Sequence, residues 1–406
     1  MLESFLAALA LQAGYNAALV AVGAGLLGIA AGAGGTFLFL RKRALVSDAV
    51  AHATLPGVAL AFIVMVALGG DGRSLPGLLI GSAVTAGIGL VLVEWIARRT
   101  RLAEDAAIGA VLSVFFGFGI VLLTVIQTLS SGRQAGLESF LLGSTAGMLY
   151  QDAVVIAAGG ALTLAVLVLL RRPMTLVSFD PDWAAASGVN VRAVDLAMMG
   201  LVMAVTVIGL KLVGLVLIVA LLIIPAVTAR FWTERTDAVV AIAGALGGVS
   251  GYVGAALSAS APQLPTGPII VLVAFGLFVL SLLFAPIRGV AAAAWRHRRF
   301  QLDVHRRQGL LALARGEPIF DRLTLKVLAH DGLIRPDRVA TDAGAAQAAK
   351  VLRDEKRWEV ARSIHRDEAV SGRYDGLTAI ESVLTRDEIA ELDRRLGPPA
   401  AVEGAG

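Results

Sequence analysis

The stretch RKRALVSDAVAHATLPG, from Arg41 to Gly57, runs from a basic cluster straight into an apolar segment that carries one acid and one histidine. Asp48 and His52 are four residues apart, so on a helix they share one face and offer a carboxylate oxygen and an imidazole nitrogen to the same ion. An ionisable pair at membrane depth is a functional-site candidate by default. The pair therefore predicts a path for a divalent metal cation through a membrane protein.

The composition of the chain supports the membrane part of this prediction. The 406 residues are 57% hydrophobic and 16% charged, and the mean hydropathy is +0.78, outside the range of soluble domains. Charge is segregated, because 17 of the 35 Lys and Arg and 18 of the 31 Asp and Glu lie in residues 301–406. There is no cysteine, which excludes disulfides and thiolate metal sites. The N-terminus has no basic cluster, which argues against a cleaved signal peptide.

Apolar segments long enough to cross a bilayer recur through the first 290 residues. A hydrocarbon core of ~30 Å needs about 20 apolar residues per helical span. On that scale we predict nine spans, near residues 16–40, 53–69, 77–97, 107–129, 153–170, 193–209, 212–229, 238–257 and 268–287. The sixth and seventh come from one long apolar run, which we divide at a predicted hairpin over Gly209, Leu210 and Lys211.

The distribution of Lys and Arg sets the predicted orientation. If the first span ends inside at Arg41, the loops on that side carry fifteen basic residues, and the opposite loops carry only Arg73, Arg133 and Lys211. Cytoplasmic loops hold such an excess of Lys and Arg. We therefore expect a periplasmic N-terminus, a cytoplasmic C-terminal tail, and the inner (cytoplasmic) membrane of a bacterium as the location.

Two interpretations of Asp48 and His52 follow from their spacing. In the first, Ser47 or Asp48 caps the second span and His52 is a hydrogen-bonded residue of the bundle. In the second, the pair binds a passing metal ion; oxygen with imidazole suits Mn²⁺, Fe²⁺ and Zn²⁺ better than Cu⁺, which prefers sulfur. Pro56 and Gly57 follow at once, and they are expected to kink the span or to leave carbonyl groups free.

A polar insert, SFDPDWAAASGVNV, separates the fifth and sixth predicted spans. Asp180 or Asp182 is suited to cap a short helix, Pro181 to occupy its first turn, and Gly188 to end it. An ordinary interfacial helix is one interpretation, and a docking helix for a cytoplasmic partner is the other. Glu104 and Asp105 are expected to cap the fourth span. No glycine loop ending in Lys and Ser or Thr occurs in the sequence, so any ATP must act through another subunit.

Five ordered motifs resemble the ABC-3 family of integral membrane permeases from manganese, zinc and iron importers. They are GTFLFLRKRALVSDAVAHATLPGVALAF (35–62), RLAEDAAIGAVLSVFFGFGI (101–120), FDPDWAAASGV (179–189), GLKLVGLVLIVALLIIPAVTA (209–229) and LPTGPIIVLV (264–273). The resemblance covers about residues 10–290. It implies a permease dimer, of identical or homologous chains, docked on two cytoplasmic ATPase subunits and served by a periplasmic metal-binding protein.

The same resemblance implies roles for particular residues. Asp48 and His52 would line the metal pathway. The loop that touches the ATPase would be 179–189, and the residues assigned to this coupling loop are Phe179, Asp180, Pro181, Asp182, Ala184 and Gly188. The chain would not be an enzyme and would bind no cofactor; a divalent metal ion would be its transported substrate, with ATP used by the partner subunit.

The C-terminal tail resembles the diphtheria-toxin-repressor family of metal-dependent regulators. The motifs are LAHDGLIRPD, DEKRWEVARSI and TAIESVLTRDEIAELDRRLG. The chain departs from that family at four expected metal-ligand positions, which are occupied by Glu355, Tyr374, Thr378 and Ser382. Only Glu359 and Glu381 remain as plausible metal ligands. These departures argue against a metal sensor, and the near-neutral charge of the tail argues against nucleic acid as a partner.

The expected fold is all-α. A polytopic transmembrane helix bundle over residues 1–294 precedes a small, mainly helical cytoplasmic domain over 295–406, with amphipathic helices at 356–364 and 377–397. The favoured function is the permease subunit of an ATP-driven importer of divalent manganese, zinc or iron. The alternatives are a membrane-tethered metal-responsive regulator and a secondary metal transporter.

Overall fold

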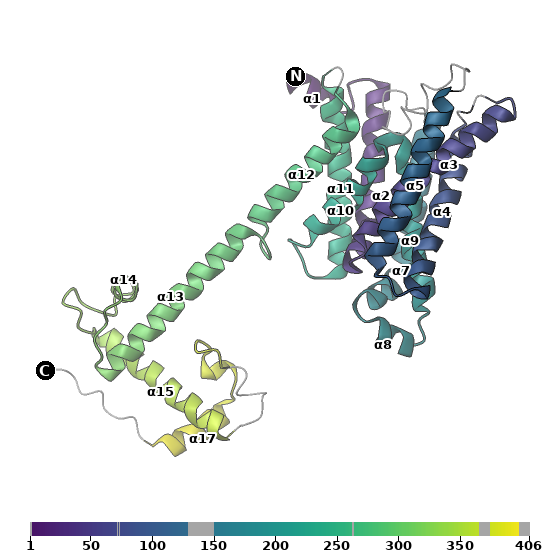
Figure 1. Cartoon of the computed structure of the whole chain (residues 1–406). Helices are drawn as coiled ribbons and strands as arrows, with labels where there is room; N and C mark the ends of the chain where they lie inside the picture. The colour runs from purple at the N-terminus through teal and green to yellow at the C-terminus, as the bar shows by residue number, and fades with distance from the viewer. Residues whose placement is uncertain are drawn as a thin grey trace. The chain divides into compact units, whose positions relative to one another are not determined.

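The computed structural model describes residues 2–70, 72, 74–128, 150–261, 264–364 and 374–397. Arg73 and Arg133, two basic residues predicted for the outer loops, lie outside these ranges. Within them the chain is helical, with a single isolated bridge between Ile334 and Ala340 (Figure 1). Two compact units divide the chain, Met1–Ala292 and Ala293–Gly406.

The first unit is a bundle of mostly long apolar helices. In chain order they are α1 Leu2–Leu9, α2 Tyr15–Leu40, α3 Ala44–Ala67, α4 Leu75–Arg99, α5 Glu104–Thr128, α7 Tyr150–Phe179, α8 Pro181–Ala186, α9 Val191–Val213, α10 Leu215–Ala229, α11 Thr236–Ala259 and α12 Thr266–Phe284. Among the described residues, eight helices are long and apolar enough to cross a membrane. The chain is therefore a multi-pass membrane protein with an all-α transmembrane bundle.

The seventh predicted span differs from expectation. It becomes α10, which is only 15 residues long and so shorter than the ~20 residues that a full crossing needs. The predicted hairpin at residues 209–211 is also misplaced, because α9 continues to Val213 and the break falls at Gly214, whose φ is 83°. Only glycine adopts this conformation without steric cost. The chain does reverse there, since the side chain of Ile218 packs directly on Gly209.

Glycine allows α2 and α11 to pack backbone against backbone. A methyl group placed on Gly28 would overlap the carbonyl oxygen of Gly247, and one on Gly247 would overlap that of Gly28. Gly32 and Gly251 make the same kind of approach one turn away on either side, to Ala243 and Ala24. Small residues bring helices together in this way inside lipid, where apolar side chains gain little by leaving the solvent.

Gly247→Ala is therefore expected to destabilise the bundle by about 2 kcal/mol, the usual cost of overpacking a tight interface. Gly276→Ala is the matched control, because nothing lies within 4 Å of the added methyl group on α12. The measurement is thermal unfolding of the purified protein in detergent. Equal melting temperatures for the two variants would contradict the packing described for α2 and α11.

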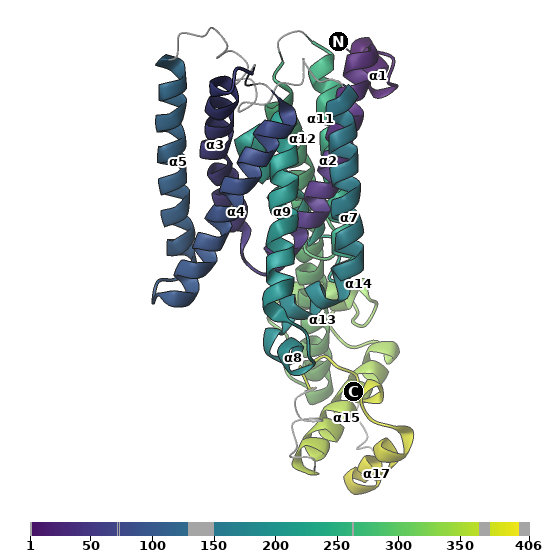
Figure 2. The same cartoon turned by 90° about the vertical axis from the view of Figure 1, so that its right-hand side faces the viewer.

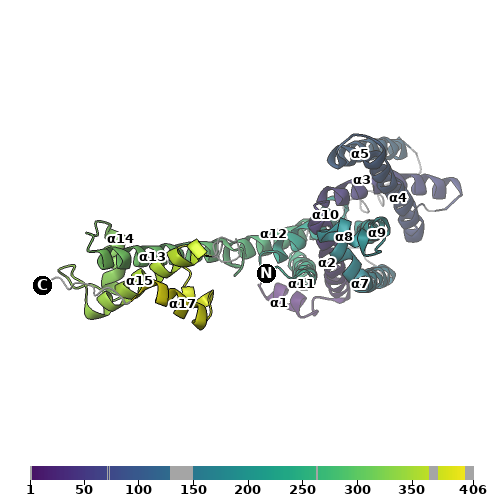
Figure 3. The same cartoon turned by 90° about the horizontal axis from the view of Figure 1, so that it is seen from below.

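The spans form two groups within the first unit. Figure 2 shows α3, α4 and α5 on one side, α2, α7 and α11 on the other, and α9 between them. The view from below agrees (Figure 3), and α9 contacts α2, α3, α4 and α7. The side of the bundle that carries Asp48 and His52 on α3 is thus distinct from the side formed by α7 and α11.

The second unit contains most of α13 Val290–Arg315, then α14 Arg322–His330, α15 Asp342–Ile364, the short 3-10 helix η1 Ile380–Ser382, and α17 Arg386–Leu396. Its core includes Leu310, Leu328, Leu333 and the fully buried Trp358. The predicted helix over 356–364 lies within α15. The helix predicted over 377–397 was placed too early, because Thr385 and Glu388 form a capping box that starts α17 at Arg386.

Candidate functional site

The turn between α2 and α3 fixes where Asp48 and His52 lie. Lys42 takes a left-handed conformation, φ 59°, and Arg43 N–H donates to Leu38 O at 2.9 Å while Lys42 N–H donates to Phe39 O at 3.0 Å. These two bonds are the Schellman ending of a helix, here with lysine where glycine is usual. They allow α3 to begin at Ala44, nine residues before the predicted span.

Because α3 begins at Ala44, the capping interpretation of Asp48 is wrong. The N-cap residue is Arg43, and no side chain caps the helix. Ser47 instead donates its hydroxyl to Ala44 O at 2.6 Å. Asp48 and His52 therefore lie inside the helix, where their side chains meet, with Nε2 of His52 3.4 Å from Oδ1 of Asp48.

The surroundings of the pair are apolar on the protein side and open on the other. Ala49, Ala51 and Ala53 of α3 are buried, whereas the Asp48 side chain is 40% exposed and the His52 side chain 18% exposed. The His52 ring meets the Phe116 ring of α5 edge to face at 5.0 Å between centroids. Its Nδ1 is buried without a hydrogen-bond partner in the described part of the chain. A buried polar atom without a partner indicates a missing ligand or a functional role.

Pro56 affects a backbone carbonyl oxygen in the same region. It lies inside α3, which continues to Ala67, and it has no N–H to give to the carbonyl four residues earlier, which is that of His52. Gly57 brings α3 against Gly81 of α4, and Gly119 brings α5 against Leu55. The carbonyl that lacks its usual helical N–H donor is thus that of His52, in a tightly packed segment.

One chain supplies only a partial metal site. Within the described residues no group of three or more His, Cys, Asp or Glu side chains is arranged to hold a metal ion. A carboxylate and an imidazole form a donor set that accommodates Mn²⁺, Fe²⁺ and Zn²⁺. Two donors from one copy match weak, transient contact with an ion better than a closed structural site, which for zinc has four ligands.

A cluster of ion pairs joins the start of α3 to α9, and sequence reasoning missed it. Arg41 Nη2 lies 3.0 Å from Asp195 Oδ2, and Arg43 Nη1 lies 3.6 Å from the same oxygen. Arg41 also donates Nη1 to the carbonyl of Val177, in the last turns of α7, at 3.0 Å. Arg43 Nε pairs with Glu104 of α5 at 2.8 Å. We call Arg41, Arg43, Glu104 and Asp195 the arginine cluster.

The arginine cluster surrounds the base of α8. Val177 lies in α7, which precedes α8, and Asp195 lies in α9, which follows it. Arg41 binds both residues and so links the two helices that flank α8. Arg192, at the start of α9, lies 3.6 Å from Glu94 of α4 and adds a second link. The sequence feature that could have identified Asp195 is an acidic residue in the first turn of an apolar predicted span. Glu104, expected to act only as a cap, also pairs across the bundle.

The polar insert has the local structure that its residues predict. Asp180 caps α8, with Oδ1 accepting from Trp183 N–H at 2.9 Å, Pro181 occupies the first turn, and Gly188 has a φ of 84° after the end. Ala184 is buried against the bundle, whereas Phe179 and Trp183 are each 59% exposed. Trp183 of the short helix and Phe179 at the end of α7 are therefore two aromatic side chains that face outward beside a fixed base.

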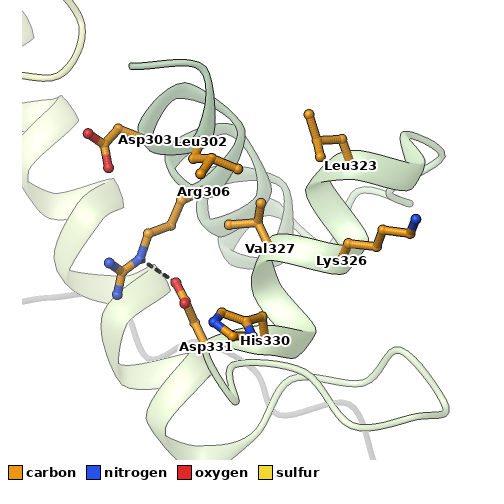
Figure 4. A pocket seen from close by; sticks show the side chains of 8 residues that line it. All are labelled: Leu302, Asp303, Arg306, Leu323, Lys326, Val327, His330 and Asp331. Carbon is orange, nitrogen blue, oxygen red and sulfur yellow. Dashed lines mark ion pairs between the residues drawn. The ribbon is translucent and has the colours of Figure 1, made fainter. Parts of the chain in front are cut away.

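Two acids near the expected ligand positions of the tail, Glu355 and Glu381, form ion pairs. Glu355 accepts from Arg307 and, at 2.6 Å, from the Tyr374 hydroxyl, while Lys350 Nζ lies 3.4 Å from Glu381. A groove of about 330 Å³ lies between α13 and α14, and Arg306 pairs there with Asp331 at 3.2 Å. Figure 4 shows this pair beside His330. These side chains form no group able to hold a metal ion among the described residues.

Acid is expected to loosen the second unit. Hydrogen bonds from Arg357 and Arg353 hold the pKa of Asp393 below its usual value, and bonds from Thr378 and from backbone N–H groups lower the pKa of Asp375 to about 2. For Glu355, burial alone raises the pKa, but bonds from Tyr374 and Arg307 outweigh it and the pKa is lowered. A carboxyl with a depressed folded pKa stabilises fully above its unfolded value, about 4, and loses that contribution as the pH falls toward the folded value.

We therefore expect α17 to lose protection between about pH 4 and pH 2. The measurement is hydrogen exchange of the α15 and α17 amides in the full-length chain, corrected for the intrinsic effect of pH, with α2 and α11 as internal references. Asp393→Asn should be less protected at neutral pH and should respond less to acid. Unchanged protection down to pH 2 would contradict the stabilising role of these carboxylates.

Comparison with known proteins places this geometry among transporters. A model of the ABC 3 transport family matches residues 15–285. The manganese transport system membrane protein MntC of Bacillus subtilis is 43% identical over 298 residues, 73% of this chain and 67% of MntC. The zinc transport system membrane protein TroC of Treponema pallidum is 38% identical over 288 residues, 71% of this chain and 95% of TroC. The solved structure of PsaBC from Streptococcus pneumoniae in complex with Fab is 30% identical, with a TM-score of 0.60, and the match covers 71% of this chain and 98% of that one.

Proposed function

Because this chain belongs to the ABC 3 transport family, we propose that it is the membrane-spanning permease subunit of an ATP-driven importer of divalent manganese or zinc. The observation that carries the proposal is the Asp48 and His52 pair, inside a buried membrane helix and open on one side. Manganese and zinc are the metals named for the relatives above; iron stays a prediction from the ligand chemistry.

The pair acts as a transient stop in the metal pathway. One copy brings one carboxylate and one imidazole, and a second permease related by a twofold axis brings the same donors again. The Asp48 side of the bundle is then the side on which two permeases meet. A site completed only between two chains binds and releases an ion as the chains move, which suits a pathway.

Coupling to ATP runs through α8. Asp180 and Pro181 hold the helix, Phe179 and Trp183 face outward, and the arginine cluster fixes its two neighbours. A separate ATPase subunit binds this surface, hydrolyses ATP and drives the transport step, while the chain itself performs no hydrolysis. The excess of Lys and Arg in alternate loops supports a cytoplasmic α8 and tail and a periplasmic N-terminus. On that side a metal-binding protein delivers the ion.

The tail contributes to assembly rather than to metal sensing. Its acids are engaged by arginine and lysine, which favours a stabilising domain over the alternative of a membrane-tethered metal-responsive regulator. The docking surface on α8 favours an ATP-driven importer over a secondary transporter, which needs no ATPase contact.

Purification of the tagged chain from native membranes tests the proposal directly. An ATPase subunit should co-purify, and proteoliposomes holding the complex should take up Mn²⁺ or Zn²⁺ only with ATP and the delivering protein. Recovery of no ATPase, under conditions that preserve complexes, would count against the importer. ATP-independent uptake by the chain alone would favour the secondary transporter instead.

Removing the cap of α8 is expected to weaken ATPase binding. Asp180→Ala leaves the Trp183 N–H without its acceptor, and loss of an N-cap costs about 1 kcal/mol, which is large for a helix of six residues. Recovery of the ATPase and metal uptake should fall about fivefold. Asp180→Asn is the control, because asparagine caps as well as aspartate. Equal losses in both variants would indicate a role for the charge rather than for the cap.

A further inference from the structure

A basic pocket lies beside α8 at one end of the bundle, between α7 and α11. It has a volume of about 550 Å³, and its lining includes Arg171, Arg172 and Phe179 from α7 and Arg235 at the start of α11. Asp237 contributes one negative charge, but it is 4.0 Å from Arg171 at its nearest, and both side chains are half exposed or more. Three arginines against one aspartate leave the pocket with an excess of positive charge.

An apolar groove continues from this pocket toward the middle of the membrane. Its volume is about 350 Å³, and its lining includes Phe37, Leu167, Val168, Val240 and Ala241. Arg171 and Asp237 line both spaces, so the two are contiguous. Along α11 the lining passes from Arg235 at the helix start to Ala245 within the span, and along α7 it passes from Phe179 back to Leu164.

The dimensions of the groove match one leaflet of a bilayer. From Asp237 to Ala245 on α11 is eight residues, or about 12 Å at 1.5 Å per residue. Half of a hydrocarbon core is about 15 Å. The charged part therefore lies at the level of the headgroups, and the apolar part at the level of the acyl chains of the same leaflet.

We propose that this composite space binds one anionic phospholipid, with its phosphate on Arg171, Arg172 and Arg235 and an acyl chain along the groove. Basic pockets between membrane helices on the cytoplasmic side recognise anionic headgroups. An acidic segment of a protein partner accounts for the arginines alone; only a lipid also fills an apolar groove at membrane depth. The site lies on the α7 and α11 side, away from Asp48 and His52, so it remains open to lipid when two permeases meet on the other side.

The test compares lipid retained by the purified chain, without ATPase, after extraction and mass spectrometry. The triple variant Arg171→Gln, Arg172→Gln and Arg235→Gln should retain about tenfold less anionic phospholipid than wild type. The triple variant Arg99→Gln, Arg101→Gln and Arg298→Gln removes the same charge from exposed positions elsewhere and should retain the wild-type amount. Equal retention by the two triple variants would overturn the proposal.

A second pair of substitutions separates a lipid from other occupants. Ala241→Phe with Ala245→Phe, both on exposed positions of α11, fills the groove and leaves the arginines in place. It should also displace the bound anionic lipid. Full lipid retention would overturn the proposal, and if this variant, purified separately from native membranes as a complex, also lost the ATPase or the second permease, the surface would be assigned to that protein instead. Neither readout involves metal transport, so a failure here is distinct from a failure of the importer.

Discussion

Asp48→Ala and His52→Ala are each expected to abolish metal uptake, by about 100-fold or more, while the complex still assembles. Each substitution removes one of the two proposed donors to the ion, which lie 3.4 Å apart on α3. With one donor removed, the protein replaces less of the hydration shell of a passing ion. The free-energy barrier to passage of the ion therefore rises.

Assembly should survive because neither side chain supports the fold by hydrogen bonds. Asp48 is 40% exposed, and Nδ1 of His52 has no partner among the described residues, so truncation leaves no new buried group unpaired. The edge contact with Phe116 is the main packing loss. Uptake of ⁵⁴Mn or ⁶⁵Zn by proteoliposomes is the measurement, and Asp105→Ala on the exposed start of α5 is the control. Wild-type uptake by properly assembled Asp48 and His52 variants would remove the pair from the pathway.

Conservative variants refine this result. Asp48→Asn keeps an oxygen but loses the charge, and His52→Gln keeps a polar group but loses the imidazole. Since hard carboxylate oxygen suits Mn²⁺ and imidazole suits Zn²⁺, the first variant should impair manganese uptake more and the second zinc uptake more. Identical profiles for the two metals would indicate that selectivity lies outside this pair.

Local sequence signals predicted most of the helices and the contact between Asp48 and His52, because both features depend on residues that are close together in the sequence. The separation of Asp48 from His52 brings their side chains together on any helix, and Asp180, Pro181 and Gly188 specify α8 through caps and backbone preference. The start of α3 was missed because Lys42 adopts a conformation that glycine usually takes, and nothing in the sequence marks it.

The sequence alone does not predict contacts between residues that are far apart along the chain. Arg41 and Asp195 are 154 residues apart, and only the packing of α2, α7 and α9 brings them together. The hydrophobic helices also lack a marked apolar face, so their sequence does not say which side packs inward. The hairpin near Gly214 was misplaced for a related reason, since the long apolar run also contains Gly200 and Gly209, and the sequence does not show at which glycine the chain turns.

Asp195→Ala is expected to destabilise the bundle by about 3 kcal/mol, the cost of leaving buried charges without their partner. The Asp195 side chain is 7% exposed and pairs with Arg41, which is 16% exposed, and with Arg43, which is 24% exposed. Arg43 keeps its ion pair with Glu104 after the substitution, but within the described part of the chain Arg41 retains only the carbonyl of Val177 as a partner. Asp237→Ala, at a side chain 72% exposed, removes the same charge at little cost and serves as the control.

The position of the arginine cluster makes the loss functional as well as structural. Arg41 joins the last turns of α7 to the first turns of α9, and α8 lies between them, so its release frees the base of the helix that we propose binds the ATPase. In proteoliposomes, Asp195→Asn should lower the metal transported for each ATP hydrolysed more than it lowers hydrolysis. Asp195→Glu, which retains the charge, should restore part of that ratio. An unchanged melting temperature for Asp195→Ala, or an unchanged transport ratio for Asp195→Asn, would show that α8 is held by its apolar contacts, such as the buried Ala184, rather than by these charges.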